Sequence, residues 1–600
     1  MLSSRTFWIA LAAHVLLLLA VMPASPWEFD EPLFFQALDQ YDPLAHHPPP
    51  PGYPLFIHVA QIVRLVVPSD FATLMTISLL GSIAGFVLLA LAFRNLAGDD
   101  VTGVAGAWLF YVSPAMLVHS TLPISEPGAI ALLAAALYFL TRNPASPALF
   151  ALFAALAVGW RIQFSIFVVP LFLTALPFLR RRDVEGFARF RPLVVALVVF
   201  TLVCIAWLVP LTIAVGGVPE LIAFERGQGE YLAAQDAAES RTGWTPARIA
   251  FRFIGRAWGT EWMALGLLAL AGTGFLLLLR ARLRIFIPIG VGAATYIAFA
   301  LAVMDPADGV RYAIPFVLTT AFLAAFGAIA IARRLSVPPL ILPLLLSVAF
   351  AAWVSPLLIQ RRTSDSPPVR AAEYARANFP PGTVVLYELP LWPHATYFLG
   401  QFDPHRVDDG LEKFYDRPEV PLFIYADGAT SRSDARVFAW KPSDAYLKLT
   451  RNHYRATSII PVPPERRFRA VRGVYAPERE QDGLEWRWLD PAAEIQLPQG
   501  GERMLTIRLG LPSAAPLERN QVSISVDGRP AGTFEIVRGD PRSMVVPVPA
   551  GAPIVRIEAE ESFVPAEVPS LRSGDRRRLA VELYELVTAA PQRSGGVEDG

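Results

Sequence analysis

The 600-residue chain is too apolar for an ordinary water-soluble protein. Hydrophobic residues make up 54% of it and charged residues only 17%, whereas average globular chains are about one quarter charged. The formal net charge is zero, which gives no basic footprint for nucleic acid, and the single cysteine, Cys204, cannot form an internal disulfide. The composition excludes a disordered chain, a collagen and a disulfide scaffold, and it indicates a polytopic membrane protein with a soluble region.

Apolar runs recur along residues 1–355 and predict an α-helical membrane domain with about 11 spans. A spanning helix needs about 20 apolar residues. The first run could instead be a signal peptide, because Met22-Pro23-Ala24 ends in a small residue. The predicted spans are residues 6–23, 71–94, 101–119, 126–141, 146–160, 162–179, 192–215, 258–280, 285–303, 312–332 and 338–355.

Arginines gather at alternate ends of these spans, and this pattern predicts the topology. Lysine and arginine are enriched on the cytoplasmic side of membrane helices. The side that holds Arg5 also holds Arg94, Arg142, Arg180, Arg181, Arg182, Arg280, Arg282, Arg284, Arg333 and Arg334. The arrangement requires the apolar run Tyr53 to Val67 to lie at the interface without crossing. An odd number of spans then places everything after Ser355 outside.

Charge and turn residues return to ordinary density after Ser355, and two soluble parts are expected there. Residues 356–478 read as an external α/β subdomain, with a helix at Pro367 to Phe379. Residues 479–590 read as a β-sandwich of jelly-roll type, and residues 591–600 as a tail. Strands of the α/β part are expected at 383–387, 422–425, 437–440 and 458–461.

The sandwich prediction rests on period-two alternation. Leu505, Ile507, Leu509 and Leu511 alternate with polar or small residues, and Asp527-Gly528 is a hairpin signal. Such a domain resembles carbohydrate-binding modules, in which Trp486 and Trp488 could stack on sugar rings. The same two tryptophans could equally be core residues of a domain that only packs.

Acids, arginines and histidines collect in the segments assigned to the outer side. Ionisable groups at the edge of a membrane are costly to keep, so they are functional candidates by default. The first outer loop, residues 23–70, and the shorter outer segments supply Asp30, Glu31, His46, His47, Tyr53, Glu126, Arg161, Arg311 and Tyr312.

This set suits the transfer of a sugar from a lipid that carries a phosphate. A single displacement needs a carboxylate to take the proton from the acceptor hydroxyl, and a cation to neutralise the departing phosphate. Asp30 or Glu31 could supply the base. Arg161 and Arg311 could hold the phosphate, because the planar guanidinium group binds phosphate oxygens in pairs.

The motifs resemble those of the C-type (GT-C) integral-membrane glycosyltransferases, such as the protein O-mannosyltransferases and the lipid A aminoarabinose transferase. The resemblance covers residues 1–355 and implies an inverting transfer from a polyprenyl-phosphate sugar, with the aspartate of the Asp-Glu pair as the base. Glu126 stands where many relatives carry aspartate, which leaves the division of labour among the acids open. The matching pieces are Asp30-Glu31, His47-Pro48-Pro49, Pro51-Gly52-Tyr53-Pro54-Leu55, Ser125-Glu126, Arg161 and Arg311-Tyr312-Ala313-Ile314-Pro315.

Three groups of site residues follow from this reading: catalytic, donor phosphate-binding, and acceptor-contacting or supporting. The alternatives are that the acids cap helix N-termini, that Arg161 snorkels at a helix end, and that Arg311 pairs with Asp305 or Asp308. The three groups are Asp30 and Glu31; Arg161, Arg311 and Tyr312; and Glu126, His46, His47 and Tyr53.

No metal site is predicted, since His46 and His47 with Asp42 nearby do not make a set of converging ligands. No cofactor is firmly expected, although a divalent metal ion could bridge an acid and the donor phosphate. The expected partners are a polyprenyl-phosphate sugar donor, a glycan, lipid or protein acceptor, and membrane lipid.

The excess of arginine over the three lysines is typical of GC-rich bacteria, so we expect the reaction at the periplasmic face of an inner membrane. Alternative functions are a transporter or flippase of lipid-linked sugars, and an inactive relative that only binds glycan.

Overall fold

The computed structural model describes residues 4–179, 189–239, 241, 243–281, 283–451, 454–480, 483–571 and 573–590. The chain forms two compact units, Met1–Ser366 with Pro442–His453, and Pro367–Lys441 with Tyr454–Gly600. The predicted tail at 591–600 and the arginines at 180–182 and 282 lie outside the described residues, as do the side chains of Arg280 and Arg284.

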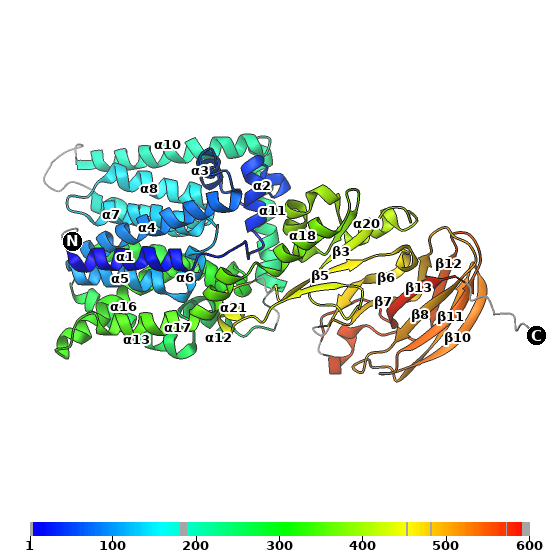
Figure 1. The fold of residues 1–600 in the computed structure, drawn as a ribbon. Coiled ribbons are helices and arrows are strands. Elements are labelled where there is room, and N and C mark those ends of the chain that lie inside the picture. The colour runs from blue at the N-terminus through cyan, green and yellow to red at the C-terminus, as the bar shows by residue number, and fades with distance from the viewer. Residues whose placement is uncertain are drawn as a thin grey trace, which may run out of the picture. The chain divides into compact units, whose positions relative to one another are not determined.

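The first unit is a bundle of helices (Figure 1). Long apolar helices are joined by shorter ones, and α3, α6, α8 and α12 begin at proline, whose fixed φ suits the first helical turn. The helices are α1 (Arg5–Ala20), α2 (Glu31–Asp39), α3 (Pro54–Arg64), α4 (Asp70–Ala97), α5 (Asp100–Val112), α6 (Pro114–Ser120), α7 (Glu126–Thr141), α8 (Pro147–Trp160), α9 (Ser165–Leu179), α10 (Arg191–Ala214), α11 (Val218–Tyr231), α12 (Pro246–Ala250), α13 (Glu261–Ala281), α14 (Leu283–Val303), α15 (Gly309–Tyr312), α16 (Ile314–Arg334), α17 (Ile341–Thr363) and α21 (Asp444–Leu449).

Among the described residues, six helices are long and apolar enough to cross a membrane, or up to seven if α5 and α6, bent by 70°, count as one span. The shorter apolar helices α1, α7, α8 and α9 occupy the other predicted positions. Every predicted span therefore falls on a helix, and the chain is a multi-pass membrane protein. Length and composition support six or seven crossings, so the count of 11 stays a prediction.

Helix ends that carry the predicted cytoplasmic arginines lie together at one end of the bundle. The Arg333 Nη2 atom at the end of α16 lies 3.0 Å from Asp99 Oδ2 at the α4–α5 turn. At the same end, Asn95 Nδ2 donates to Thr141 Oγ1 over 3.4 Å, next to Arg142. Figure 1 shows the N-terminus at this end and α2 and α11 at the opposite end. The charge pattern thus corresponds to two distinct ends of the bundle.

The apolar run Tyr53 to Val67 forms only the short helix α3, which has 11 residues. At 1.5 Å per residue this helix is about 16 Å long, roughly half the thickness of a bilayer core. The run is too short to cross, in agreement with the interfacial helix that the sequence predicts.

The second unit begins with an α/β subdomain built on a five-stranded sheet in the order β2-β1-β3-β5-β4. β2, β1 and β3 are parallel, while β5 is antiparallel to both β3 and β4. α18 and α19 cover one face and α20 the other. The elements are α18 (Pro367–Asn378), β1 (Val384–Tyr387), α19 (Trp392–Phe398), β2 (Pro404–Arg406), α20 (Val407–Phe414), β3 (Leu422–Asp427), β4 (Arg436–Ala439) and β5 (Ala456–Pro461).

The rest of this unit is one curled antiparallel sheet in the order β10-β9-β12-β7-β13-β8-β11, with β6 paired to β7. Its two ends, β10 and β11, are consecutive in the chain, so the sheet folds back on itself and is nearly a barrel. The strands are β6 (Arg469–Arg479), β7 (Glu485–Gln496), β8 (Arg503–Gly510), β9 (Arg519–Val526), β10 (Arg529–Val537), β11 (Arg542–Val548), β12 (Ile554–Ala559) and β13 (Val581–Ala589).

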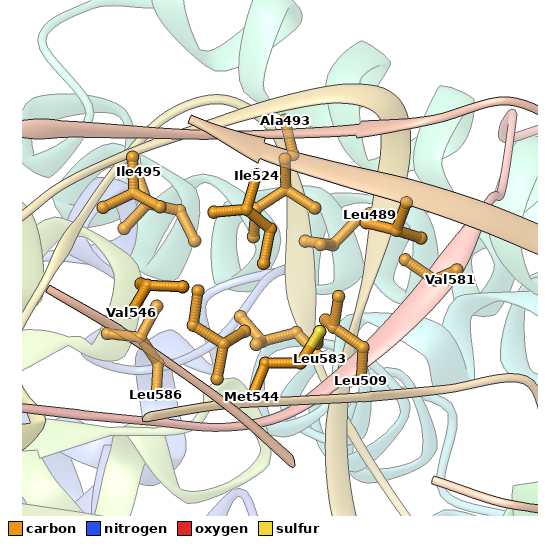
Figure 2. Close-up of a cluster of buried hydrophobic side chains, with 14 of the residues drawn as sticks. Leu489, Ala493, Ile495, Leu509, Ile524, Met544, Val546, Val581, Leu583 and Leu586 are labelled. Atoms are coloured by element: carbon orange, nitrogen blue, oxygen red, sulfur yellow. The ribbon is translucent and has the colours of Figure 1, made fainter. Parts of the chain in front are cut away.

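The core of this sheet follows the predicted alternation. Figure 2 shows Ile495 and Ile524 facing Val546 and Met544 across the interior. The predicted inward residues of β8 are fully buried, and Asp527-Gly528 has positive φ at both positions, as a two-residue hairpin requires. Opposite walls of the one curled sheet therefore enclose a single core, and the two-layered sandwich of jelly-roll type stays a prediction.

Of the two tryptophans weighed for sugar stacking, Trp488 is buried and its ring meets Phe563. Trp486 is partly exposed. Trp488 therefore belongs to the core.

Candidate active site

Glu126 lies between Arg161 and Arg311, at the end of the bundle opposite the predicted cytoplasmic arginines. Its Oε1 atom is 2.6 Å from Arg161 Nη1 and also accepts a hydrogen bond from Arg311 Nε. Its Oε2 atom accepts from the Ser125 hydroxyl. The side chains of Glu126 and Arg161 are each only 2% exposed. A carboxylate this deeply buried requires such partners, because an unpaired charge away from water is very unfavourable.

Close packing of α7 on α8 brings these groups together. A side chain at Gly128 would overlap the indole ring of Trp160, whose atoms lie within 2.7 Å of the position of a Cβ atom there. The Trp160 indole N–H donates to the Ser125 carbonyl over 3.0 Å, and Arg161 Nη1 donates to the Ser125 hydroxyl over 3.0 Å. The absence of a side chain at Gly128 thus allows the start of α7 to meet the end of α8.

Arg311 connects this pair to the loop that carries Asp30. Its Nη1 atom lies 2.7 Å from Asp30 Oδ2 and 3.9 Å from Asp308 Oδ2. Its Nη2 atom is buried and has no hydrogen-bond partner within the described part of the chain. The Asp30 side chain is 24% exposed, much more than that of Glu126. Asp30 is therefore the accessible acid of the cluster.

The His46–Tyr53 loop places an aromatic ring under Arg161. Tyr53 has φ +43°, unusual for a bulky residue, and directly follows Gly52 at φ +101°. This backbone brings the Tyr53 ring to 5.7 Å from the Arg161 guanidinium and packs it edge-on against Phe34. Tyr53 thus supports Arg161 through a cation–π contact.

The segment that carries Arg311 is itself held by arginines. Arg252 donates to the carbonyls of Pro306 and Ala307 over 2.9 and 2.8 Å. Arg451 Nη2 lies 3.1 Å from Asp305, whose carboxylate also accepts from the Ala307 amide. These contacts fix the short turn in front of α15. They also bear on the alternative that Arg311 pairs with Asp305 or Asp308. Asp305 pairs with Arg451, whereas Asp308 does lie within 3.9 Å of Arg311, in addition to the shorter contacts of Arg311 with Asp30 and Glu126.

Glu31 points into a second polar cluster. Its Oε2 atom accepts from the Trp27 amide over 2.6 Å, and the residue is fully buried. Nearby, Glu28 Oε1 lies 2.8 Å from Arg361 Nη2. The Arg361 guanidinium sits 5.8 Å from each of the rings of Trp27 and Tyr446. Glu31 therefore faces Glu28 and Arg361, whereas Asp30 faces Arg311.

Burial controls the ionisation of the acids in these outer segments. Burial, together with the nearby charge of Glu28, raises the pKa of Glu31 to about 8. Burial also raises the pKa of Asp308 to about 7, although Arg311 and Arg451 oppose this shift. Glu31 is therefore mainly protonated at neutral pH, and it cannot accept a proton there.

The remaining predicted site residues occupy peripheral positions. The carboxylate of Asp42 accepts from the amides of Leu44 and Ala45, and its backbone pairs with that of His47, so it shapes the loop. His46 is exposed, and Tyr312 packs in an apolar cluster with Phe253 and Met304. In the described ranges, no group of three or more His, Cys, Asp or Glu side chains could hold a metal ion.

The structure brings together four predicted residues, namely Asp30, Glu126, Arg161 and Arg311, and places Tyr53 beneath them. Arg161 does not snorkel, because its side chain is buried. Sequence reasoning missed the Glu28–Arg361 pair. The sequence does place an acid, Glu28, two residues before Asp30. The Arg361-Arg362 pair, however, looks like the ordinary positive charge that follows a membrane span.

Neither a model of a known protein family nor a curated protein matches this chain. Solved structures similar to it include ArnT from Cupriavidus metallidurans bound to undecaprenyl phosphate, at 12% identity and a TM-score of 0.47, over 76% of this chain and 98% of that one. The apo oligosaccharyltransferase of Archaeoglobus fulgidus has 11% identity and a TM-score of 0.46, over 94% and 97%. The mycobacterial arabinofuranosyltransferase AftD has 12% identity and a TM-score of 0.42, over 99% and 59%. All three are GT-C glycosyltransferases, the class that the motifs resemble.

The raised pKa of Glu31 predicts a pH-dependent contribution to stability. An ordinary glutamate titrates near 4.5, so the folded state binds this proton more tightly than the unfolded state. The contribution is fully present below about pH 4.5 and is lost as the pH rises to about 8. In thermal unfolding in detergent, the Glu31→Gln variant should lose less stability than the wild type as the pH rises. The difference in the free energy of unfolding should reach at most about 5 kcal/mol above pH 8.

The matched control is Glu230→Gln on α11, where the side chain is exposed. Parallel pH profiles for the wild type and Glu31→Gln would contradict the assignment of a neutral Glu31.

Proposed function

We propose that the protein is an inverting glycosyltransferase that moves a sugar from a polyprenyl-phosphate donor to an acceptor hydroxyl at the outer face of the membrane. The observation that carries this proposal is the cluster in which Arg311 joins accessible Asp30 to buried Glu126 and Arg161. It places one acid and two guanidinium groups at the end of an apolar helix bundle, where a prenyl chain can remain in lipid.

The step is a single displacement. The Asp30 carboxylate takes the proton of the acceptor hydroxyl, and the acceptor oxygen attacks the anomeric carbon of the sugar. The bond between that carbon and the phosphate oxygen breaks, and the polyprenyl phosphate leaves with the electron pair. Attack from the face opposite the phosphate inverts the anomeric centre.

Asp30 suits the role of base better than either glutamate. Both carboxylate oxygens of Glu126 already accept hydrogen bonds, and its side chain is only 2% exposed. Glu31 is buried, and its pKa is raised to about 8. Asp30 is a partly exposed acid held in place by a cation. Glu126 then acts as the residue that positions both arginines.

Arg311 and Arg161 suit the departing phosphate. The buried Nη2 atom of Arg311, which has no partner among the described residues, is available to a phosphate oxygen. When Asp30 takes a proton, its attraction for Arg311 weakens just as negative charge grows on the leaving group. The two guanidiniums then face less negative charge, because only Glu126 and the more distant Asp308 remain beside them, and the cluster becomes more favourable for phosphate.

The other predicted contacts complete the proposal. Tyr312 is proposed to assist Arg311 at the phosphate, and His46 and His47 to contact the acceptor. A divalent ion between acid and phosphate is a further proposal, which chelation by EDTA tests. The acceptor is a glycan, lipid or protein on the periplasmic side of a bacterial inner membrane.

Asp30→Asn should abolish sugar transfer, because asparagine cannot take the acceptor proton. We expect a loss of about 10²- to 10⁴-fold, measured as transfer of radiolabelled sugar from undecaprenyl-phosphate donors to acceptors in membranes. The matched control is Asp39→Asn on α2, whose side chain is 68% exposed and pairs with Arg64. Near-normal transfer by the Asp30→Asn variant would remove Asp30 as the base.

Arg311→Ala and Arg161→Ala should weaken use of the donor more than use of the acceptor. Loss of one hydrogen bond from a charged donor is worth about 1.5–3 kcal/mol, or roughly ten- to a hundredfold in kcat/KM for the donor. Donor and acceptor titrations measure the two effects separately. Arg142→Ala, at the other end of the bundle, serves as control and should change neither. Equal loss for donor and acceptor would argue against phosphate binding by these arginines.

A reporter placed after the second unit should be exposed on the outer side of the membrane. The expectation follows from the predicted cytoplasmic arginines and the predicted odd number of spans, which together place the residues after Ser355 outside. A periplasmically active phosphatase and a cytoplasmically fluorescent protein, fused in turn to the C-terminus, distinguish the two sides. Fluorescence without phosphatase activity would overturn the proposed sidedness.

A further inference from the structure

A crevice between the α/β subdomain and strand β6 is not used by the proposed transfer reaction. It has a volume of about 310 Å³ and lies at the carboxyl ends of the three parallel strands, where Tyr387, Arg406 and Asp427 end β1, β2 and β3. From β1 the chain moves to β2 on one side and then returns to β3 on the other. Ligands of open α/β sheets bind in the crevice at such a reversal of strand order, and the volume lies in the range of about 300–1,000 Å³ that is usual for ligand sites.

The residues after β1 do not suit a phosphate. Phosphate sites at this position need a glycine-rich turn and free amides at the start of a helix. Here the turn is Glu388-Leu389-Pro390, with a carboxylate at its start and a proline that has no N–H. α19 also carries Pro393 in its first turn. Four carboxylates and two guanidiniums line the crevice, so its field opposes any anionic ligand.

The crevice offers hydrogen-bond acceptors and donors side by side. Glu388 accepts from the Asp427 amide over 2.8 Å and pairs with Arg479 at 2.9 Å, so its carboxylate is fixed in place. Arg406 is exposed at the rim and can donate. A sugar hydroxyl both donates and accepts, and it therefore complements this mixture.

An apolar side chain lies on the same wall. Leu389 lines the crevice, and its side chain is 61% exposed. The C–H face of a sugar ring can cover such a side chain while its hydroxyls reach the polar groups.

A second crevice of about 400 Å³ continues from the first and shares four residues with it, Glu388, Val407, Pro477 and Arg479. It runs to Arg508 and Tyr584 on the curled sheet. The two crevices together make a groove with room for more than one sugar.

We propose that this groove binds an uncharged oligosaccharide, with Asp427, Glu388 and Arg406 on its hydroxyls and Leu389 against a ring face. The site belongs to the second unit, and binding to it does not depend on the transfer reaction at Asp30.

Hydrogen–deuterium exchange of the full-length protein in detergent tests the proposal. The probes are hexasaccharides of mannose, galactose, arabinose and glucose, with a hexagalacturonate as the charged control. At millimolar concentration, at least one neutral probe should slow exchange in peptides that cover residues 387–390 and 425–428, and the galacturonate should not. Asp427→Asn and Arg406→Ala should each weaken this protection about tenfold in apparent Kd, whereas the matched control Asp540→Asn, at a 64% exposed aspartate, should not.

Two results would overturn the proposal: no protection with any neutral probe, or equal protection in the wild type and both variants. Thermal unfolding checks that the variants fold, and Arg406→Ala, at an exposed side chain, keeps the test valid if Asp427→Asn does not. Protection that persists in Asp30→Asn shows that the groove acts independently of transfer. The proposal that the groove binds oligosaccharide can therefore hold even if the protein does not transfer sugar.

Discussion

Glu126 is held almost without water between Arg161 and Arg311, and the geometry of this end of the bundle follows from this contact. Removing one member of a buried ion pair leaves an uncompensated charge, which is unfavourable by about 3–5 kcal/mol. The carboxylate therefore ties the start of α7, the end of α8 and the turn before α16 to one another. Through Arg311 the same contact reaches Asp30 in the first outer loop.

This arrangement gives three chemically similar carboxylic acids different environments. Glu126 is saturated with hydrogen bonds, Glu31 is buried beside Glu28 and mainly protonated, and Asp30 keeps access to solvent while an arginine orients it. The environment, more than the residue type, decides which carboxylate can exchange a proton. In the proposed reaction, this pairing holds the guanidiniums in place before substrate binds, so they would need no rearrangement when charge develops on the leaving phosphate.

Much of this organisation could be predicted because it depends on local pattern. Apolar runs of helical length placed every predicted span on a helix, and alternation identified the inward residues of β8. Asp30, Glu126, Arg161 and Arg311 were identifiable because ionisable groups at the ends of apolar helices are rare.

The features that were missed depend on contacts between distant parts of the chain. Glu28 and Arg361 are separated by 333 positions, and neither residue stands out from its neighbours. The curling of the sheet through β10 and β11 also arises from strand pairing that no short window contains. The 70° bend between α5 and α6 falls at Ser113-Pro114, where the proline interrupts the helix. The crevice at the ends of β1 and β3 requires the strand order, which residue spacing does not provide.

A structure determined with undecaprenyl phosphate bound is the most direct test of the central claim that the guanidiniums of this cluster receive the phosphate. The phosphate oxygens should lie within hydrogen-bond distance of Arg311 Nη2, with Arg161 on the same side, Asp30 facing the position of the sugar, and the prenyl chain along the bundle. A phosphate bound elsewhere, with the Glu126 contacts unchanged and Asp30 remote from the lipid, would contradict the account.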